Sequence, residues 1–319
     1  MKYDAIALGE LLIDFVSTCK NEIGYPILTA NPGGAPGNFL AAMSKYGYKT
    51  AMIGKVGEDM FGHLLIETMN MTGIDTRGIK MASDCFTTLA FVSLDEGGNR
   101  DFSFARKPGA DMCLTPEEVD TDLIANARVF HFGTLSLTNE PSAAATRLAV
   151  LTAREKGVLI SLDPNLRKPL WKTEEDARKA FEWSLRQADI VKISDEEIDW
   201  LWGVSPEVGT IRLLEEYGIS LVYATMGPKG CYAATRKNSV MVSCPYGIQT
   251  VDTTGAGDIF GGSAMSRFLE YEKHPSDLTE EELKRIVLFA CIAASLSTQK
   301  HGGIASVPDI EEVEKWLCK

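Results

Sequence analysis

Three short apolar runs at nearly equal spacing constrain the fold of this chain more than any other feature. The runs are Val158–Leu162, Ile190–Ile193 and Leu221–Ala224. They lie about thirty residues apart, which is the length of one strand–helix–strand unit. The stretches that precede them predict helices over residues 142–156, 174–187 and 206–217. These units predict an α/β fold with parallel strands, in which ligands bind at the carboxyl ends of the strands.

A second group of segments predicts antiparallel strands. Residues 86–94 and 100–106 flank a turn, Asp95–Asn99, whose composition is typical of a hairpin. Residues 11–28 also have an extended pattern. The pattern leaves two interpretations open, an ordinary edge hairpin and a small β lid over the main domain.

The charge balance narrows the classes of function. The chain has 32 Lys and Arg against 44 Asp and Glu, so its formal net charge is 32 − 44 = −12. A nucleic-acid-binding protein would carry a basic surface, and so would a protein that binds anionic membranes. Neither class of partner is therefore expected. A phosphate-containing ligand is still allowed, because backbone amides hold phosphate without basic side chains.

The cysteines and the apolar runs indicate a cytoplasmic protein. The seven cysteines are scattered and form no C-x-x-C pair, which favours free thiols in a reducing compartment. The N-terminal segment carries Asp4 and Glu10 inside its apolar stretch, so it does not resemble a signal peptide. The longest apolar run, Ile286–Ala294, is too short to span a bilayer.

Residues 252–258, DTTGAGD, are the strongest local signal for chemistry. They open an apolar stretch, Ile259–Leu269, that predicts a buried helix. Glycines at a helix start expose backbone N–H groups to an anion, and the helix dipole favours negative charge there. Asp258 would repel a phosphate at this position, so we interpret it as a general base aimed at an attacking hydroxyl. With an ordinary pKa of about 4 it would be ionised at pH 7. A plain helix cap is the alternative.

Two other nucleotide-binding motifs are absent from the sequence. The dinucleotide fingerprint G-x-G-x-x-G lacks its third glycine, because Phe260 stands there. This disfavours an NAD-dependent oxidoreductase. Gly54-Lys55 is followed by Val56 and not by a hydroxyl residue, and no Walker A loop occurs elsewhere. A kinase with this sequence would not be a P-loop kinase.

Two N-terminal segments could hold a polyhydroxy ligand. Residues 33–38, GGAPGN, precede a helical pattern, and paired glycines permit a close backbone approach. Asn38 could bind a hydroxyl through its amide or simply cap the helix. Asp14 ends the apolar segment GELLID, where its carboxylate could accept sugar hydroxyls or lie on the surface.

Polar residues also follow the three predicted parallel strands. Arg167 ends the segment DPNLR and could pair with a triphosphate. Glu197 closes the segment SDEE, and its carboxylate could help to hold hydrated Mg²⁺. Residues 225–230, TMGPKG, supply glycines that could lie along a nucleotide. All three segments are expected at one edge of the sheet.

The combination of GGAPGN and DTTGAGD resembles the two signatures of the ribokinase/PfkB sugar kinase family. The resemblance covers nearly the whole chain and includes residues 54–59, 163–167 and 225–230. It implies a three-layer α/β/α sandwich around a mostly parallel sheet, formed as a single catalytic domain over residues 1–319. It also implies a discontinuous β lid, built from about residues 11–33 and 84–110.

The resemblance also implies a role for each motif residue. Asp258 would be the catalytic base, with an anion hole formed by Gly255, Ala256 and Gly257. The sugar would be held by Asp14, Gly33, Gly34, Asn38 and Arg106. ATP would lie along Arg167, Ser194, Thr225, Gly227 and Gly230, as well as Gly255 and Gly257. Glu197 would support Mg²⁺ indirectly, and Asp252 and Thr254 match positions that help to hold K⁺ in relatives.

Within the family, the segments around Asp14, Arg106 and Glu197 are most similar to those of bacterial fructokinases. The expected activity is transfer of the γ-phosphate of ATP to the primary hydroxyl of D-fructose. Kinases acting on 2-keto-3-deoxygluconate, ribose or an aminoimidazole riboside share the mechanism and remain alternatives. A catalytically silent regulatory relative is a further alternative. Cys291 stands where many relatives have an Asn, in the late helix that borders the adenine. The exposed edges of the lid strands lead us to expect a homodimer.

Overall fold

The computed structural model of the chain describes residues 2–94 and 100–318. Its centre is a nine-stranded sheet, parallel from β5 to β11 and antiparallel only at β12 and β13. The strands run in the spatial order β13 (Ser239–Val242), β12 (Cys231–Ala234), β11 (Leu221–Thr225), β10 (Ile190–Ser194), β9 (Leu159–Leu162), β8 (Ala127–Phe132), β1 (Tyr3–Leu8), β4 (Thr50–Gly57) and β5 (Asp75–Ala82).

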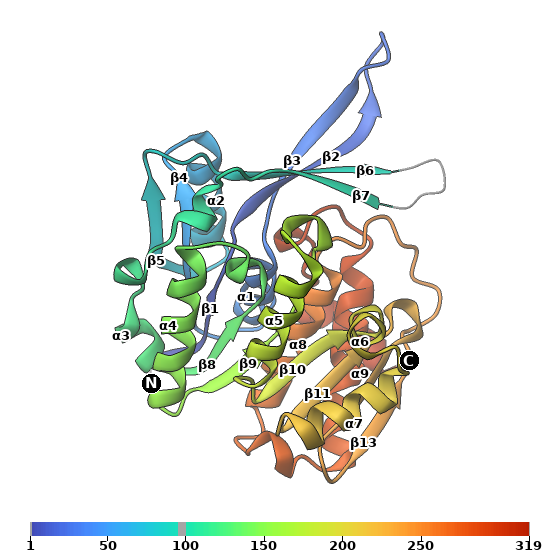
Figure 1. Cartoon of the computed structure of the whole chain (residues 1–319). Helices are drawn as coiled ribbons and strands as arrows, with labels where there is room; N and C mark the ends of the chain where they lie inside the picture. Colours follow the sequence, from blue (N-terminus) through green and yellow to red (C-terminus); the bar gives the residue numbers. More distant parts are fainter. Residues whose placement is uncertain (1, 95–99, 319) are drawn as a thin grey trace.

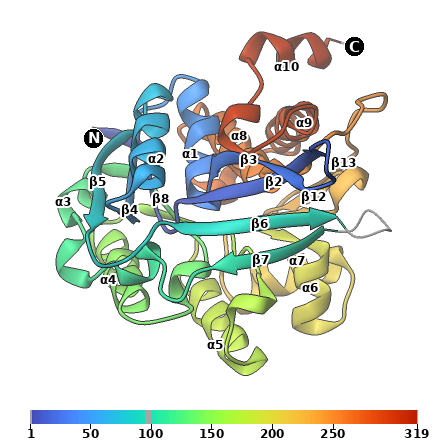
Figure 2. The ribbon, with the colours of Figure 1, turned by 90° about the horizontal axis from the view of Figure 1, so that it is seen from above.

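Helices cover both faces of this sheet, as Figure 2 shows from above. One face is covered by α1 (Ala35–Lys45), α2 (Met60–Met71), α8 (Ala256–Leu269), α9 (Glu280–Ser297) and α10 (Ile310–Leu317). The other is covered by α3 (Thr121–Ala125), α4 (Ser142–Glu155), α5 (Glu174–Leu185), α6 (Asp195–Trp202) and α7 (Pro206–Glu216). The structure therefore confirms the predicted α/β/α sandwich.

Alternation along the strands explains why two cores form. In β1, Ala5 and Ala7 belong to the core under α1 and α8, whereas Ile6 and Leu8 belong to the core on the opposite face. Successive side chains of a strand point to opposite faces, so a strand that is apolar at every position must be covered on both sides.

The predicted repeating units are confirmed with small shifts at their ends. The helices expected over residues 142–156, 174–187 and 206–217 are α4, α5 and α7. Helix α8 begins at Ala256, before the apolar stretch that predicted it, so the DTTGAGD segment runs into its first turn. This shift places Asp258 inside the helix.

A second, smaller sheet lies across the carboxyl ends of the central strands (Figure 1). Its strands are arranged in the order β3 (Pro26–Gly33), β2 (Leu12–Lys20), β6 (Thr88–Leu94) and β7 (Arg100–Ala105). β2 and β6 are parallel, and the two outer pairs are antiparallel. The expected turn Asp95–Asn99 lies outside the described residues. The limits proposed for the lid, like the single-domain assignment, remain predictions.

Among the described residues, no helix combines the length and the apolar character that crossing a bilayer requires.

Candidate active site

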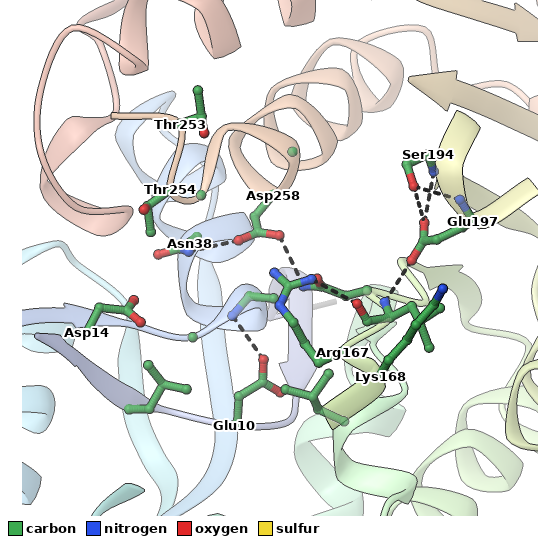
Figure 3. A pocket seen from close by; sticks show the side chains of 18 of the residues that line it. Glu10, Asp14, Asn38, Arg167, Lys168, Ser194, Glu197, Thr253, Thr254 and Asp258 are labelled. Carbon is green, nitrogen blue, oxygen red and sulfur yellow. Dashed lines mark hydrogen bonds between the residues drawn. The ribbon is translucent and has the colours of Figure 1, made fainter. Parts of the chain in front are cut away.

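A cavity of about 560 Å³ opens between the second sheet and the carboxyl ends of the central strands. The second sheet contributes Asp14 from β2 and Phe104 from β7. The central domain contributes the start of α1, the loop after β9, the end of β10 and the start of α8. Figure 3 shows Asp14, Arg167 and Asp258 around this cavity, although they come from segments far apart in the sequence.

The start of α8 forms one wall of the cavity. Gly255 has a φ of 76°, a left-handed conformation that favours glycine, and a Cβ there would lie 2.8 Å from the Cα of Gly303. Gly255 and Gly257 line the cavity, while Ala256 between them does not. The helix N-terminus therefore meets the cavity with bare backbone and the positive end of its dipole, as an anion site requires.

Asp258 is held by two amide side chains from distant segments. Asn38 Nδ2 donates to Asp258 Oδ2 at 2.8 Å, and Asn165 Nδ2 donates to Oδ1 at 3.4 Å (Figure 3). Burial and the nearby carboxylate of Asp163 raise the pKa of Asp258 to about 6, although Asn38 and Lys192 oppose the shift. The expected ordinary pKa was therefore wrong, because the sequence does not show this desolvation. The carboxylate is still largely ionised at pH 7.

An ion pair lies behind Asp258 that the sequence analysis did not single out. Lys192 Nζ donates to Asp163 Oδ2 at 2.9 Å, and the two side chains are only 14% and 6% exposed. A Cβ at position 257 would lie 3.0 Å from Lys192 Nζ, so the ammonium group abuts the first turn of α8. One feature of the sequence could have pointed to this ion pair, namely the lysine inside the apolar strand β10.

The second sheet brings the predicted sugar-binding residues to the other end of the cavity. Asp14, Gly34 and Asn38 line it, whereas Gly33 lies behind Asp14, with its Cβ position 2.6 Å from Asp14 Oδ2. Gly34 has a φ of 117° and would bring a Cβ within 2.3 Å of the Glu10 carbonyl oxygen, so glycine is required there.

Glu10 is a second cavity residue that the sequence analysis did not assign. It is 4% exposed, and its Oε1 accepts a hydrogen bond of 3.1 Å from the backbone N–H of Ala35. Burial raises the pKa of Glu10 to about 7, and the charge of Asp111 adds to this shift, whereas backbone hydrogen bonds and the charge of Arg106 oppose it. Its carboxyl group fixes the segment that carries Gly34 and Asn38.

The predicted nucleotide side is held together by Glu197. Its Oε1 accepts from the backbone N–H of Leu166 at 2.7 Å, and its Oε2 accepts from the N–H and the hydroxyl of Ser194 at 2.9 and 3.0 Å. Ser194 caps α6 in return by accepting from the N–H of Glu197. Ser194, Glu197 and Arg167 all line the cavity, so the loops after β9 and β10 form one surface.

Five other predicted residues do not line this cavity. Thr225, Gly227 and Gly230 follow β11, and Gly230 has a φ of 105°, with Val242 O 2.0 Å from its Cβ position. Arg106 is 6% exposed and bonds to Asp111, Thr138 Oγ1 and the carbonyl of Leu135. The remaining residue, Asp252, is 4% exposed. Their roles in binding remain predictions.

Asp252 organises the turn before α8. Its Oδ1 accepts from the backbone N–H of Thr254 at 2.8 Å, and its Oδ2 accepts from that of Gly302 at 3.2 Å. Thr254 lines the cavity. Within residues 2–94 and 100–318, no three His, Cys, Asp or Glu side chains gather as a metal site.

The pattern of the pfkB family carbohydrate kinases matches residues 3–310 of the chain. The chain belongs to this family. Fructokinase-2 of Solanum lycopersicum is 39% identical over 310 residues, which are 96% of this chain and 94% of that protein. The family assignment agrees with the cavity, where both signature segments meet.

Two solved bacterial structures share the fold along its whole length. A putative ribokinase II of E. coli, in complex with ATP and Mg²⁺, has a TM-score of 0.87 and 27% identity, covering 99% of both chains. A double mutant of the Vibrio cholerae O395 fructokinase, in a form with fructose, ADP and potassium bound, has the same TM-score, identity and coverage. The PfkB kinase fold is thus shared over the entire chain.

Proposed function

We propose that this protein is a fructokinase that transfers the γ-phosphoryl group of ATP to the primary hydroxyl of D-fructose. The observation that carries the proposal is the placement of Asp258 at the glycine start of α8, bonded to Asn38, inside a cavity covered by the second sheet. Relatives named fructokinase, at 39% identity over nearly the full length, support fructose as the acceptor.

In the mechanism, Asp258 accepts the proton of the primary hydroxyl as the bond to phosphorus forms. The loose transition state needs this proton removal late, so a carboxylate with a pKa of about 6 is sufficient. The backbone at residues 255–257 faces the charge that develops on the transferred phosphoryl group. The second sheet covers the site and limits attack by water.

Other residues hold the two substrates. Asp14, Gly33, Gly34 and Asn38 would bind the sugar, and Arg106 would act from behind Leu135, whose carbonyl it bonds. The nucleotide would lie along the surface formed by the loops after β9, β10 and β11, with residues Arg167, Ser194, Thr225, Gly227 and Gly230. This division follows the cavity, in which Asp258 lies between Asp14 on one side and Ser194 and Glu197 on the other (Figure 3).

Mg²⁺ fits a site of this composition. The ion usually keeps several waters and is held by one or two carboxylates together with substrate phosphates. Glu197 faces the cavity and would act on it indirectly, since its oxygens already bond Leu166 and Ser194. Bound Mg²⁺ supplies charge neutralisation to the phosphates of ATP. Asp252 and Thr254 would support K⁺ beside the anion hole.

The decisive experiment is a phosphorylation screen with ATP and Mg²⁺. D-Fructose should give the highest kcat/KM, with the phosphate on its primary hydroxyl. A preference of tenfold or more for 2-keto-3-deoxygluconate, ribose or an aminoimidazole riboside would move the assignment to that sugar. Binding of sugar and ATP without turnover would instead support a silent regulatory relative, an alternative that the intact Asp258 and its glycines disfavour.

We also propose a cytoplasmic homodimer. The second sheet leaves the outer edges of β3 and β7 unpaired within the described chain, and Ile23, Tyr25 and Ile27 on the β2–β3 hairpin are exposed. Exposed edges and apolar side chains favour pairing with a second copy. A sedimentation experiment that finds only monomer at micromolar concentration would contradict the dimer and leave the kinase assignment intact. The compartment rests on the sequence, whose seven scattered cysteines without a C-x-x-C pair are typical of proteins in a reducing environment.

A further inference from the structure

Two cysteine side chains meet at the base of the second sheet. The Sγ atoms of Cys85 and Cys113 lie 2.8 Å apart, although 28 positions separate them in the chain. A disulfide bond has an S–S distance of about 2.05 Å, so a small shift of the two side chains would bring them to bonding distance. Both residues are partly exposed, so a small oxidant can reach them.

The pair spans the two ends of the β6–β7 hairpin. Cys85 lies between β5 and β6, and Cys113 ends the short helical turn Ala110–Cys113 that follows β7. At this base an isolated bridge joins Phe86 to Gly109, the backbone N–H of Ala110 donates to the carbonyl of Phe86, and Thr88 Oγ1 donates to Asp111 Oδ1. A covalent link here would therefore close the hairpin at its base.

The same base carries the polar network that reaches the active-site cavity. Thr88 Oγ1 donates to Asp111 Oδ1, Asp111 pairs with Arg106, and Arg106 Nη2 donates to the carbonyl of Leu135 at 3.2 Å. Leu135 lines the cavity. Cys113 is only two residues from Asp111, which holds Arg106 in place. A restraint between Cys85 and Cys113 would thus act on the segment that positions Arg106.

We propose that Cys85 and Cys113 form a reversible disulfide that restrains the base of the β6–β7 hairpin and slows turnover. The oxidant is a low-molecular-weight disulfide. The Cys85 thiolate attacks one of its sulfurs and releases one thiolate, which gives a mixed disulfide. Cys113 loses its proton, attacks the Cys85 sulfur and releases the second thiolate. The two protein thiols are oxidised by two electrons, and the oxidant is reduced to two thiols.

The surroundings assign the order of attack. Burial and the hydrogen bond with Cys85 raise the pKa of Cys113 to about 12, so Cys113 keeps its proton until a mixed disulfide stands beside it. Lys55, whose ammonium group donates to the Cys113 carbonyl at 3.1 Å and pairs with Glu118, opposes only part of this rise in the pKa of Cys113. Cys85 is therefore the first thiol to react.

The test treats the full-length enzyme with oxidised glutathione and measures two properties. Free thiols should fall by two per chain, and peptide mapping should recover one cross-linked peptide that contains Cys85 and Cys113. Turnover of the enzyme's sugar substrate should fall by at least about threefold, because the cross-link would shift the segment that carries Asp111, the partner of Arg106. Dithiothreitol should restore both properties.

Matched variants separate this pair from the other cysteines. The double variant Cys85→Ser/Cys113→Ser should keep its turnover under oxidation, whereas Cys318→Ser, which removes an exposed thiol at the end of α10, should respond as the unmodified chain does. Thiols also meet at Cys244 and Cys291, so a cross-link there, with Cys85 and Cys113 still reduced, would overturn the proposal. Unchanged turnover in fully cross-linked enzyme would overturn it as well. The thiol count does not depend on the proposed fructokinase activity, so the two proposals can fail separately.

Discussion

Asn38 Nδ2 donates a hydrogen bond of 2.8 Å to Asp258 Oδ2, across a separation of 220 positions in the sequence. This single contact joins the GGAPGN segment at the start of α1 to the DTTGAGD segment at the start of α8. Helices α1 and α8 pack side by side on one face of the sheet, and Gly262 of α8 allows the close approach, since its Cβ would lie 2.3 Å from Phe39 O. The two signature segments therefore form one site.

Replacement of Asp258 by Asn should lower kcat by roughly 10²–10⁴-fold, the usual contribution of a positioned general base. The substitution keeps the shape and removes the negative charge and the basicity. ATP binding should be unchanged or tighter, because a negative charge beside the phosphates is lost. Steady-state kinetics and nucleotide titration measure both effects, with Asp277→Asn on the exposed surface as the control. Near-full activity would mean that Asp258 has only a structural role, as the acceptor of the hydrogen bonds from Asn38 and Asn165.

The pH profile of kcat/KM should report the ionisation of Asp258. Only the deprotonated carboxylate accepts a proton, so activity should be lost as pH falls through about 6 and should level off above it. The bond from Asn38 lowers the pKa of Asp258. Asn38→Ala should therefore move the inflection upward by roughly one pH unit, the equivalent of one hydrogen bond to a charged group. If Asn38→Ala leaves the inflection where it is, the pH profile does not report the ionisation of Asp258.

Lys192→Met should reduce kcat/KM at least about tenfold at pH 7, because the buried carboxylates of Asp163 and Asp258 lose their nearby positive charge. The loss should be smaller at higher pH, where Asp258 ionises again. Lys192→Arg keeps the charge and should restore part of the activity, and Lys179→Met on the exposed surface should have no effect.

Thermal unfolding must accompany these kinetics, since removal of one partner of a buried ion pair also destabilises the fold. The double variant Lys192→Met/Asp163→Asn removes both charges and should recover stability without recovering activity. Full recovery of activity in the double variant would show that Lys192 serves only to neutralise Asp163.

Glu10 should make the stability of the protein depend on pH. Its pKa is raised from 4.5 to about 7 in the folded chain, so the folded state favours the protonated form. Its stabilising contribution is complete below pH 4.5 and is lost as pH rises through about 7. The side chain of the Glu10→Gln variant cannot ionise, so its stability does not change with pH at this position. Between pH 5 and pH 8 the free energy of unfolding of the unmodified chain should therefore fall, relative to that of the variant, by up to roughly 3 kcal/mol. Denaturant unfolding at both values tests this, with exposed Glu281→Gln as the control. Equal differences at the two pH values would contradict it.

Exchange of Na⁺ for K⁺ at constant ionic strength should raise kcat. Asp252 ties the turn at Thr254 to Gly302 beside the start of α8, and a bound monovalent cation would stabilise that turn against the charge it faces. Asp252→Asn should weaken the dependence on K⁺ while the fold remains intact by circular dichroism. An equal rate in both salts would remove the potassium site from the mechanism.

Local sequence patterns determined the parts of this protein that depend on short-range chemistry. The spacing of three apolar runs predicted β9, β10 and β11 with their crossover helices, because strand and helix periodicities are properties of neighbouring residues. The glycines of DTTGAGD predicted an anion-binding helix start for the same reason. The signature segments also predicted the family, and the match over residues 3–310 confirms it.

Only the tertiary structure decided which charges meet. The alignment of β9 and β10 brings Lys192 to Asp163, and the packing of α1 on α8 brings Asn38 to Asp258. The fold also brings the guanidinium group of Arg106 to Asp111, Thr138 and the carbonyl of Leu135, while its role at the sugar stays a prediction. Desolvation and charge contacts act through space over a few ångströms, and the residues involved are far apart in the chain. The local motif was therefore enough to identify Asp258 as a candidate site residue. Its pKa depends on burial and on charges brought together by the fold.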